Sequence, residues 1–235
     1  LELDLTAALR PRPATNAAER AVRRVVRTAS KVREHGFSGM LQASIEDLQS
    51  WAEAQQAEVV TMADADGNVT ILFSDIENST SLNERLGDDT WVRVLAAHDS
   101  LVRNRVEHFR GQVVKTSGDG FMVAFRDAEA ACRAAVGIQK DLRRTFDPML
   151  RVVAPVKVRI GIHTGTVISR DGDYYGRNVA MAARVGDLAT GGEVLATSAV
   201  HDHLDDDAAV RLVAMGEVEL KGLPGLHVVY RVATQ

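Results

Sequence analysis

Two aspartates, each at the edge of a short apolar segment, are the residues of this sequence best suited to chemistry. Asp75 ends the apolar run in VTILFSDIENST, residues 69–80, and Asp119 lies in the glycine turn of KTSGDGF, residues 115–121. Carboxylates at strand ends bind Mg²⁺ through few protein ligands and leave coordination positions for phosphate oxygens. Together the two acids predict a metal-assisted phosphoryl-transfer site.

Each aspartate also has a purely structural interpretation. After Asp75 come Asn78, Ser79 and Thr80, whose backbone N–H groups open the next predicted helix. This segment fits a phosphate held at a helix N-terminus, but it also fits a plain helix cap after a core strand. The turn at Asp119 fits a tight hairpin tip, where Asp and Gly are favoured for their backbone conformations. Either acid alone would leave the structural interpretation in place, and only the pair favours chemistry.

The elements that must position these acids follow from hydrophobic periodicity. From residue 69 onward, strand and helix patterns alternate in a way that indicates an α/β or α+β domain. Residues 69–74 are apolar on both faces, which predicts a central strand, and Asp119 should lie at the tip of a hairpin. The remaining expectations are strands over 112–116, 121–125, 156–168, 194–196, 210–215 and 226–232, and helices over 82–109 with a break at Gly87, 128–146, 176–188 and 198–204.

The first quarter of the chain has a different character. Residues 1–15 contain prolines and no period, so they read as a linker or a disordered end, and residues 16–62 are predicted to form a helical segment. Its first helix opens on a capping box at Asn16 and Glu19 and carries a basic face. That face suits phosphates or a membrane surface, but also plain solvent beside an acidic neighbour. We expect a regulatory or dimerisation segment, followed by a catalytic domain over 66–235.

Composition excludes several classes of protein. The 235 residues have a hydrophobic content of 46%, a charged content of 26% and a formal net charge of -4, which gives no overall attraction to nucleic acid. The single cysteine, Cys132, excludes a disulfide framework within one chain and fits the reducing cytoplasm. No apolar stretch is long enough to cross a bilayer, and no signal sequence opens the chain. Because the chain begins with Leu1, we expect a piece of a longer protein, with an unseen sensor domain as one candidate for the rest.

Four segments in fixed order resemble the class III nucleotidyl cyclases. They are FSDIENST, VKTSGDGFMVAF, RIGIHTG and DYYGRNVAMAARV, and the resemblance covers roughly residues 68–232. It implies an α+β fold with a ferredoxin-like core, βααβββαβ in style, acting as a head-to-tail homodimer with its sites at the interface. It further implies two Mg²⁺ or Mn²⁺ ions per site on Asp75 and Asp119, with the backbone carbonyl of Ile76 helping to hold one ion.

The resemblance also assigns the nucleotide-binding residues. Lys115 and Asp173 match the family's pair that selects adenine, in which the lysine donates to a ring nitrogen and the aspartate accepts from the exocyclic amine. Guanine presents the reverse pattern, so this pair points to ATP. Arg184 matches the arginine that stabilises charge on the α-phosphoryl group in the transition state, and Lys221, in ELKGL, matches a lysine that binds the terminal phosphates.

One position departs from the family pattern. Four residues before Arg184 the family usually has an asparagine that orients the ribose, whereas this chain has Ala180. Asn178 is two residues away along a helix, which turns its side chain by about 200° to the opposite face. Arg177 shares a face with Ala180 and Arg184 and is a candidate to compensate. Without compensation, the lost hydrogen bond predicts slow rather than absent chemistry.

These patterns lead to one main hypothesis and a rival. The main one is an adenylate cyclase that converts ATP to 3′,5′-cyclic AMP and pyrophosphate, by two-metal-assisted attack of the ribose 3′-hydroxyl on the α-phosphorus at a homodimer interface. The rival is a catalytically weak or inactive cyclase-like regulatory module that binds nucleotide, which Ala180 favours. A diguanylate cyclase is disfavoured because its GGDEF-type signature is absent.

Overall fold

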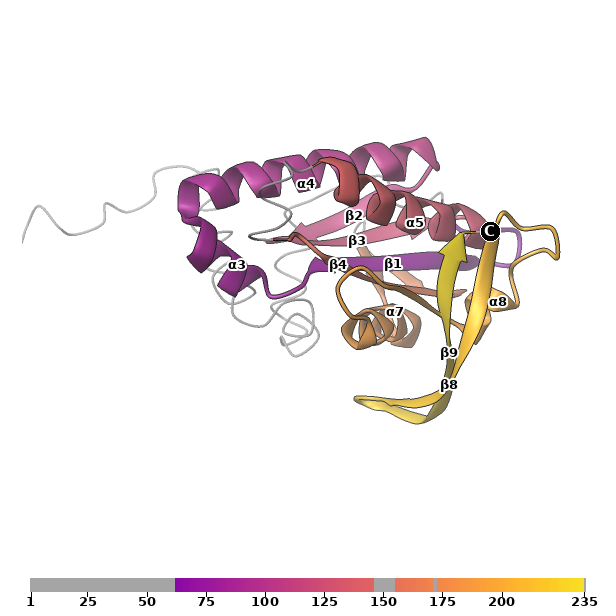
Figure 1. The fold of residues 1–235 in the computed structure, drawn as a ribbon. Helices are drawn as coiled ribbons and strands as arrows, with labels where there is room; N and C mark the ends of the chain where they lie inside the picture. The colour runs from indigo at the N-terminus through magenta and orange to yellow at the C-terminus, as the bar shows by residue number, and fades with distance from the viewer. Residues whose placement is uncertain (1–61, 146–154, 171–172, 235) are drawn as a thin grey trace, which may run out of the picture.

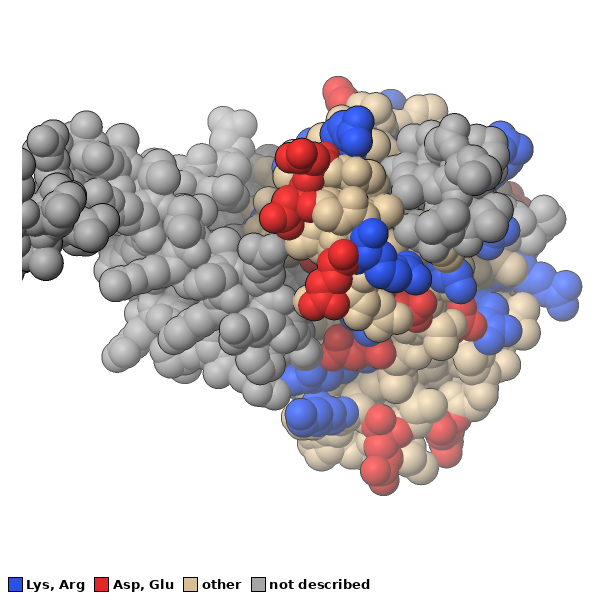
Figure 2. Space-filling model, turned by 60° about the vertical axis from the view of Figure 1, so that its left-hand side comes forward, with Lys and Arg blue, Asp and Glu red and all other residues tan. Residues whose placement is uncertain are grey.

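The computed structural model describes residues 62–145, 155–170 and 173–234. The expected linker, residues 1–15, and the expected helical segment up to residue 61 lie outside the described residues, so both remain predictions. No helix in the described part of the chain is long and apolar enough to cross a membrane. On the face presented in Figure 2, acidic and basic side chains are interspersed over the surface.

The described chain forms a seven-stranded sheet, a separate two-stranded sheet, and helices (Figure 1). The strands are β1 (Asn68–Ile76), β2 (Gln112–Ser117), β3 (Gly120–Phe125), β4 (Val158–Thr166), β5 (Ile168–Arg170), β6 (Asp173–Tyr175), β7 (Val194–Thr197), β8 (Val210–Leu220) and β9 (Leu223–Thr234). The helices are α3 (Ser79–Leu86), α4 (Asp88–His108), α5 (Ala128–Thr145), α7 (Arg177–Leu188) and α8 (Ser198–His201).

The large sheet has the strand order β2-β3-β1-β4-β7-β9-β8. Its first four strands, with the paired helices α3 and α4 after β1 and α5 before β4, have the order and connections of a ferredoxin-like core. Helices α4 and α5 cover one face of the sheet, and α7 covers the other (Figure 1). This arrangement confirms the predicted α+β class and its ferredoxin-like core.

Strand β1 occupies the centre of the sheet because both of its faces are apolar. Leu72 and Ile76 pack into the core beneath α4 and α5, while Ile71 and Phe73 pack towards α7. Its neighbours β3 and β4 are both antiparallel to it. The prediction of a central strand is confirmed, and the strand delivers Asp75 to the edge of the core.

Several boundaries differ from the sequence-based expectation. The helix expected over 82–109 is divided at Gly87, as predicted, but its first part begins earlier, at Ser79. The strand expected over 156–168 ends at Thr166, and Ile168 begins β5. The last two strands are longer than expected and form a hairpin, β8–β9, that extends beyond the body of the domain (Figure 1). Most of β8 is exposed, so its sequence lacks the alternation that a half-buried strand shows.

Candidate active site

The two predicted metal-binding carboxylates lie close together in the structure. Asp75 is the penultimate residue of β1, and Asp119 lies in the turn between β2 and β3. Because β1 pairs antiparallel with β3, with Ser74 opposite Phe121, the end of one strand lies beside the start of the other. The backbone N–H of Ile76 donates a hydrogen bond of 3.1 Å to the Asp119 carboxylate. The hairpin tip is thereby held against the end of β1.

The environment of this pair suits a cation. Burial, and then the negative charge of Asp75, raise the pKa of Asp119 to about 7. Burial also raises the pKa of Asp75, against the opposing effect of Arg159. Two half-buried carboxylates that repel each other are stabilised by a positive charge between them. Within the described ranges, no group of three or more His, Cys, Asp or Glu side chains could hold a metal. The donor set fits a hard divalent ion that keeps positions for other oxygens, as Mg²⁺ does.

Arg159 is the site residue that the sequence analysis missed. It lies on β4 directly opposite Asp75, and its guanidinium donates a hydrogen bond to the Asp75 carboxylate. Its Nε atom is buried, with no hydrogen-bond partner among the described residues. The segment RIGIHTG contains this arginine, but only the pairing register of β1 with β4 shows that it faces Asp75. An unshifted antiparallel pairing of these two predicted strands was the signal that could have found it.

The two residues matched to purine selection form a buried ion pair. The Lys115 ammonium on β2 donates to the Asp173 carboxylate on β6 at 2.6 Å, and each side chain is only 7% exposed. The other Asp173 oxygen accepts a hydrogen bond of 2.7 Å from the backbone N–H of Tyr174. The Lys115 nitrogen lies 5.9 Å from the ring centroid of Tyr175. The structure thus brings together two residues that are 58 positions apart in the chain.

Helix α7 carries the residues matched to transition-state binding. Arg184 donates a hydrogen bond of 3.0 Å to Asp187 on the same helix. Arg177 is exposed at the first position of α7. Asn178 donates to the Thr166 carbonyl at 2.7 Å, and its side-chain oxygen lies 3.1 Å from Nε2 of His163.

These contacts decide what Asn178 can do. Its amide is engaged by β4 on the sheet-facing side of α7, so it does not replace the missing asparagine at Ala180. The structure agrees here with the helix geometry used in the sequence analysis. The departure at Ala180 therefore remains, and Arg177 is the residue on the same face as Arg184 that could offset it.

The predicted phosphate-binding residues lie in two separate places. Asn78 adopts a left-handed conformation, with φ 54° and ψ 38°, and precedes Ser79 and Thr80 at the start of α3. The Ser79 hydroxyl is hydrogen-bonded to Asp119 and acts to lower its pKa, so this helix start borders the carboxylates. Lys221 is exposed in the turn between β8 and β9. In the described part of the chain, no hydrogen bond or ion pair joins Lys221 to the carboxylates.

The chain is similar to known nucleotidyl cyclases over most of its length. The family model for the adenylate and guanylate cyclase catalytic domain matches residues 61–234. Receptor-type adenylate cyclase B of Leishmania donovani is 34% identical over 202 residues, which is 68% of this chain and 15% of that protein. An uncharacterized protein of Mycobacterium tuberculosis is 35% identical over 175 residues, covering 73% of this chain and 58% of the relative.

A solved structure shows the same architecture. An adenylate cyclase structure from Trypanosoma brucei, described as being in the monomeric state, superposes with a TM-score of 0.62 at 30% sequence identity. The match covers 71% of this chain and 89% of that one. The chain thus spans a small part of its receptor-type relative and somewhat more than half of its mycobacterial relative.

Proposed function

Because the chain belongs to the adenylate and guanylate cyclase catalytic domain family, the class III nucleotidyl cyclases, we propose that it is an adenylate cyclase acting on ATP. The observation that supports ATP over GTP is the buried pair of Lys115 and Asp173. An ammonium donates to a ring nitrogen of adenine, and a carboxylate accepts from the exocyclic amine. Guanine offers a carbonyl and an N–H at the same edge, so the pair would leave buried groups unpaired.

The carboxylates and the residues around them account for metal binding and phosphate binding. Asp75 and Asp119, with the carbonyl of Ile76, would hold Mg²⁺ or Mn²⁺, which when bound lowers the pKa of the 3′-hydroxyl and neutralises charge on the phosphates. The backbone N–H groups of Asn78, Ser79 and Thr80 lie at the start of α3, where they would donate to the phosphates. Arg159 adds positive charge beside Asp75.

Residues on α7 and in the β8–β9 turn stabilise negative charge on the phosphoryl groups. Arg184 stabilises the negative charge that develops on the α-phosphoryl oxygens, and Arg177 lies on the same face of α7. Lys221 binds the terminal phosphates from the β8–β9 turn. The products are 3′,5′-cyclic AMP and pyrophosphate. We place these groups at the interface of a head-to-tail homodimer in the cytoplasm, with the carboxylates from one chain and the purine and α7 residues from its partner.

A second function has one observation in its favour. Ala180 removes the side chain that would orient the ribose, and Asn178 is held by β4 and does not replace it. A cyclase-like module that binds nucleotide and turns it over weakly or not at all is therefore the alternative. Nucleotide binding is common to both functions, and turnover separates them.

The deciding experiment is incubation of the purified protein with ATP or GTP and either Mg²⁺ or Mn²⁺, followed by chromatography of the products. We expect cyclic AMP and pyrophosphate from ATP, and little cyclic GMP. The control is the Asp75→Ala, Asp119→Ala double variant prepared in parallel, which should bind no catalytic metal and form no product. Product at the same rate from this variant would indicate a contaminant or a different site, and ATP binding without product would favour the regulatory module.

A further inference from the structure

Helix α7 lies against alternate residues of β4, in the segment RIGIHTG. Gly161, His163 and Gly165 share one face of this strand, and His163 is paired with Ile71, which packs towards α7. A Cβ on Gly161 would come within 2.1 Å of the Gly186 backbone nitrogen, so the backbones of helix and strand are in direct contact there. Gly186 is close to the C-terminal end of α7. This contact alone does not fix the direction in which the rest of the helix runs.

A buried network of hydrogen bonds holds the N-terminal end of α7. Nε2 of His163 lies 3.1 Å from the side-chain oxygen of Asn178, and Nδ1 lies 2.8 Å from the Thr197 hydroxyl on β7. The Asn178 amide nitrogen donates to the Thr166 carbonyl at 2.7 Å. A Cβ on Gly165 would come within 2.5 Å of that nitrogen, so only glycine lets the amide lie against β4. This set of bonds, the His163 network, joins α7 to two strands.

The His163 network also fixes where the ring carries its proton. A carbonyl oxygen only accepts, so the nitrogen of Asn178 must face Thr166 and its oxygen must face His163. Nε2 of His163 therefore donates, and Nδ1 of the neutral ring accepts from the Thr197 hydroxyl. His163 is 7% exposed and Thr197 is 4% exposed, and burial lowers the pKa of His163, which favours the neutral ring. Both ring nitrogens and both amide atoms thus have partners, and moving Asn178 would leave buried groups unpaired.

The network and the glycine contact hold α7 at two points. Asn178 and Gly186 lie about 12 Å apart along the helix axis, at a rise of about 1.5 Å per residue. Arg184 lies between them, and Arg177 is adjacent to Asn178. Ala180 lies about 200° around the helix from Asn178 and shares a face with both arginines. Holding the sheet side of α7 at two points therefore fixes the place of the side chains on its other face.

We propose that His163 is a positioning residue, which through Asn178 sets the direction of α7 and so the place of Arg184 in the reaction. The effect on turnover rests on the proposed function, whereas the positioning of α7 does not. In that function the purine and the metal ions are bound by residues outside α7, and Arg184 stabilises charge that develops in the transition state. Loss of the network should therefore lower kcat and leave KM for ATP nearly unchanged.

Substitutions in the network test the effect on turnover. His163→Phe keeps a flat ring without its polar atoms, and Asn178→Ala removes the partner. Each should lower kcat about tenfold or more, with KM for ATP changed by less than about twofold. His163→Gln should retain most of the activity, because its amide nitrogen can still donate to Asn178. The double variant of His163→Phe with Asn178→Ala should lose no more activity than the less active single variant, since both act through one network.

Thr164→Val is the matched control. The Thr164 hydroxyl lies 2.9 Å from that of Thr70 on β1, and both residues are buried. Thr164 is next to His163 on β4, so its side chain is on the opposite face of the strand, away from α7. This variant also loses a buried hydrogen bond, and it should lower the melting temperature without lowering kcat.

Two measurements report on the network without reference to turnover. In nitrogen NMR of the chain with isotope-labelled histidines, the His163 signals are those absent from His163→Gln. They should show the neutral ring with its proton on Nε2 at neutral pH. Hydrogen exchange measured by mass spectrometry should become faster over residues 177–188 in His163→Phe and Asn178→Ala, and not in Thr164→Val.

Each part of the proposal has a result that would overturn it. A proton on Nδ1 of His163, or a charged ring at neutral pH, would overturn the network. Unchanged exchange over α7 in both network variants would overturn the positioning of the helix. Faster exchange with unchanged kcat, or an equal loss of kcat in Thr164→Val, would overturn the link to Arg184. An unaltered chain that forms no product from ATP would overturn the proposed function and this link with it, and the NMR and exchange results would still decide whether His163 positions α7.

Discussion

The surroundings of Asp119 move the pKa of its carboxyl group into the neutral range, which makes folding depend on pH. Its pKa rises from 3.8 to about 7 in the folded chain, first through burial and then through the charge of Asp75. Between these pH values the folded state keeps a proton that the unfolded state has released. The contribution of Asp119 to stability must therefore fall as the pH rises through this window, because this group binds more protons in the folded state than in the unfolded one.

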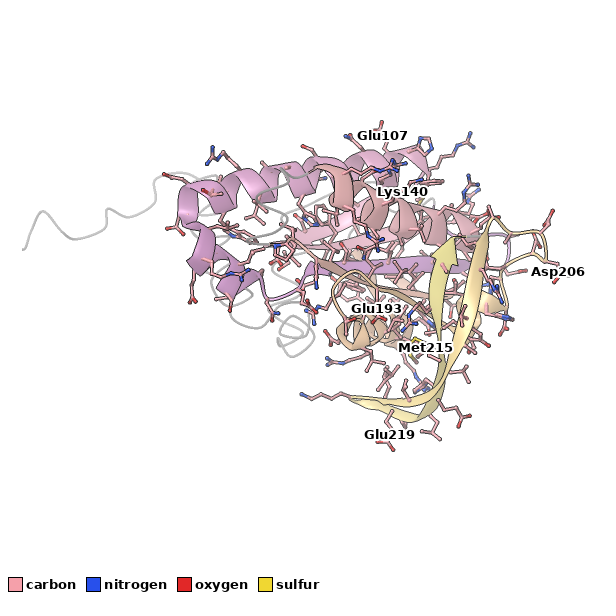
Figure 3. The ribbon with its side chains drawn as sticks, viewed as in Figure 1. Glu107, Lys140, Glu193, Asp206, Met215 and Glu219 are labelled. Carbon is pink, nitrogen blue, oxygen red and sulfur yellow. The ribbon has the colours of Figure 1, made fainter. Side chains whose placement is uncertain are left out.

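We predict that, without divalent metal, the melting temperature of Asp119→Asn rises more steeply, or falls less steeply, between about pH 4 and about pH 7 than that of the unaltered chain. The comparison is between slopes because burial lowers the pKa of His98 to about 4, and this residue makes stability rise with pH over much of the same range. Asp206→Asn, at an exposed position in the loop before β8 (Figure 3), is the control and should leave the slope unchanged. Adding Mn²⁺ at neutral pH should raise the melting temperature of the unaltered chain and not of Asp119→Asn. A variant with the same slope as the unaltered chain would show that Asp119 is not the titrating group.

Lys115 and Asp173 give the second prediction at this scale. Replacing both together, as Lys115→Glu with Asp173→Cys, reverses the donor and acceptor pattern, because a carboxylate accepts where the ammonium donated and the acceptor at position 173 is removed. The ratio of kcat/KM for ATP to that for GTP should fall about tenfold or more, since each unpaired buried group costs about 1–3 kcal/mol. The ratio is measured with both nucleotides on one preparation. Lys140→Glu, at an exposed position on α5 (Figure 3), serves as the control, and an unchanged ratio in the double variant would remove this pair from the purine site.

Individual residues differ in how far the sequence reveals their surroundings. Asp75 and Asp119 could be assigned to one site because each lies at or next to the end of a strand whose apolar pattern is clear. Arg159 could not, because its importance depends on the register between β1 and β4, and a shift of one residue would turn its side chain to the other face. The shared role of Lys115 and Asp173 in purine selection was inferred from resemblance alone, and their buried contact was not predicted, because β6 has only three residues and no pattern that identifies a strand.

At the scale of elements, α7 determines whether the altered position at Ala180 matters. The helix runs from Arg177 to Leu188, so positions 177, 180 and 184 lie along one face. We predict that Ala180→Asn raises kcat several-fold with little change in KM, because it restores a hydrogen-bonding group beside Arg184. Ala180→Leu, which has a similar shape and no polar atoms, is the control and should give no gain. If the asparagine variant is no faster, Arg177 already orients the substrate or the ribose lies elsewhere.

Element boundaries were predictable where one face of an element is buried and less so elsewhere. The central strand β1 and the helices α5 and α7 follow their apolar periodicity closely. The hairpin β8–β9 was underestimated because it leaves the body of the domain, and exposed residues such as Met215 replace the expected alternation (Figure 3). In the exposed middle of β8, pairing with β9 rather than burial holds the strand in place. Lys221 is carried at the turn of that hairpin.

For the whole molecule, the proposed dimer decides which chain's carboxylates Arg184 serves. Arg184 is bonded to Asp187, and the charge of Asp187 contributes to raising the pKa of Asp75 within the same chain. The end of α7 is therefore close enough to influence the carboxylates of its own chain. Arg184 could act there, or, in the head-to-tail dimer that we propose, it could act on a nucleotide bound to the carboxylates of the partner. The two arrangements make opposite predictions for mixtures of variants.

We predict that Asp75→Ala and Arg184→Ala, each nearly inactive alone, recover activity when mixed and allowed to exchange subunits. If each site takes its carboxylates from one chain and Arg184 from the other, a mixed dimer has one site with both substitutions and one site with neither. Random exchange makes about half of the dimers mixed, each with one good site of two, so about a quarter of the unaltered activity should return.

The matched control is a mixture of Asp75→Ala with Asp119→Ala. Both lesions fall on the carboxylate half of a site, so every site in that mixture keeps one of them and no activity should return. Cross-linking of differently tagged chains must first show that exchange has occurred. If mixed dimers form and the first mixture stays as inactive as the control, Arg184 serves the carboxylates of its own chain and the shared site is wrong.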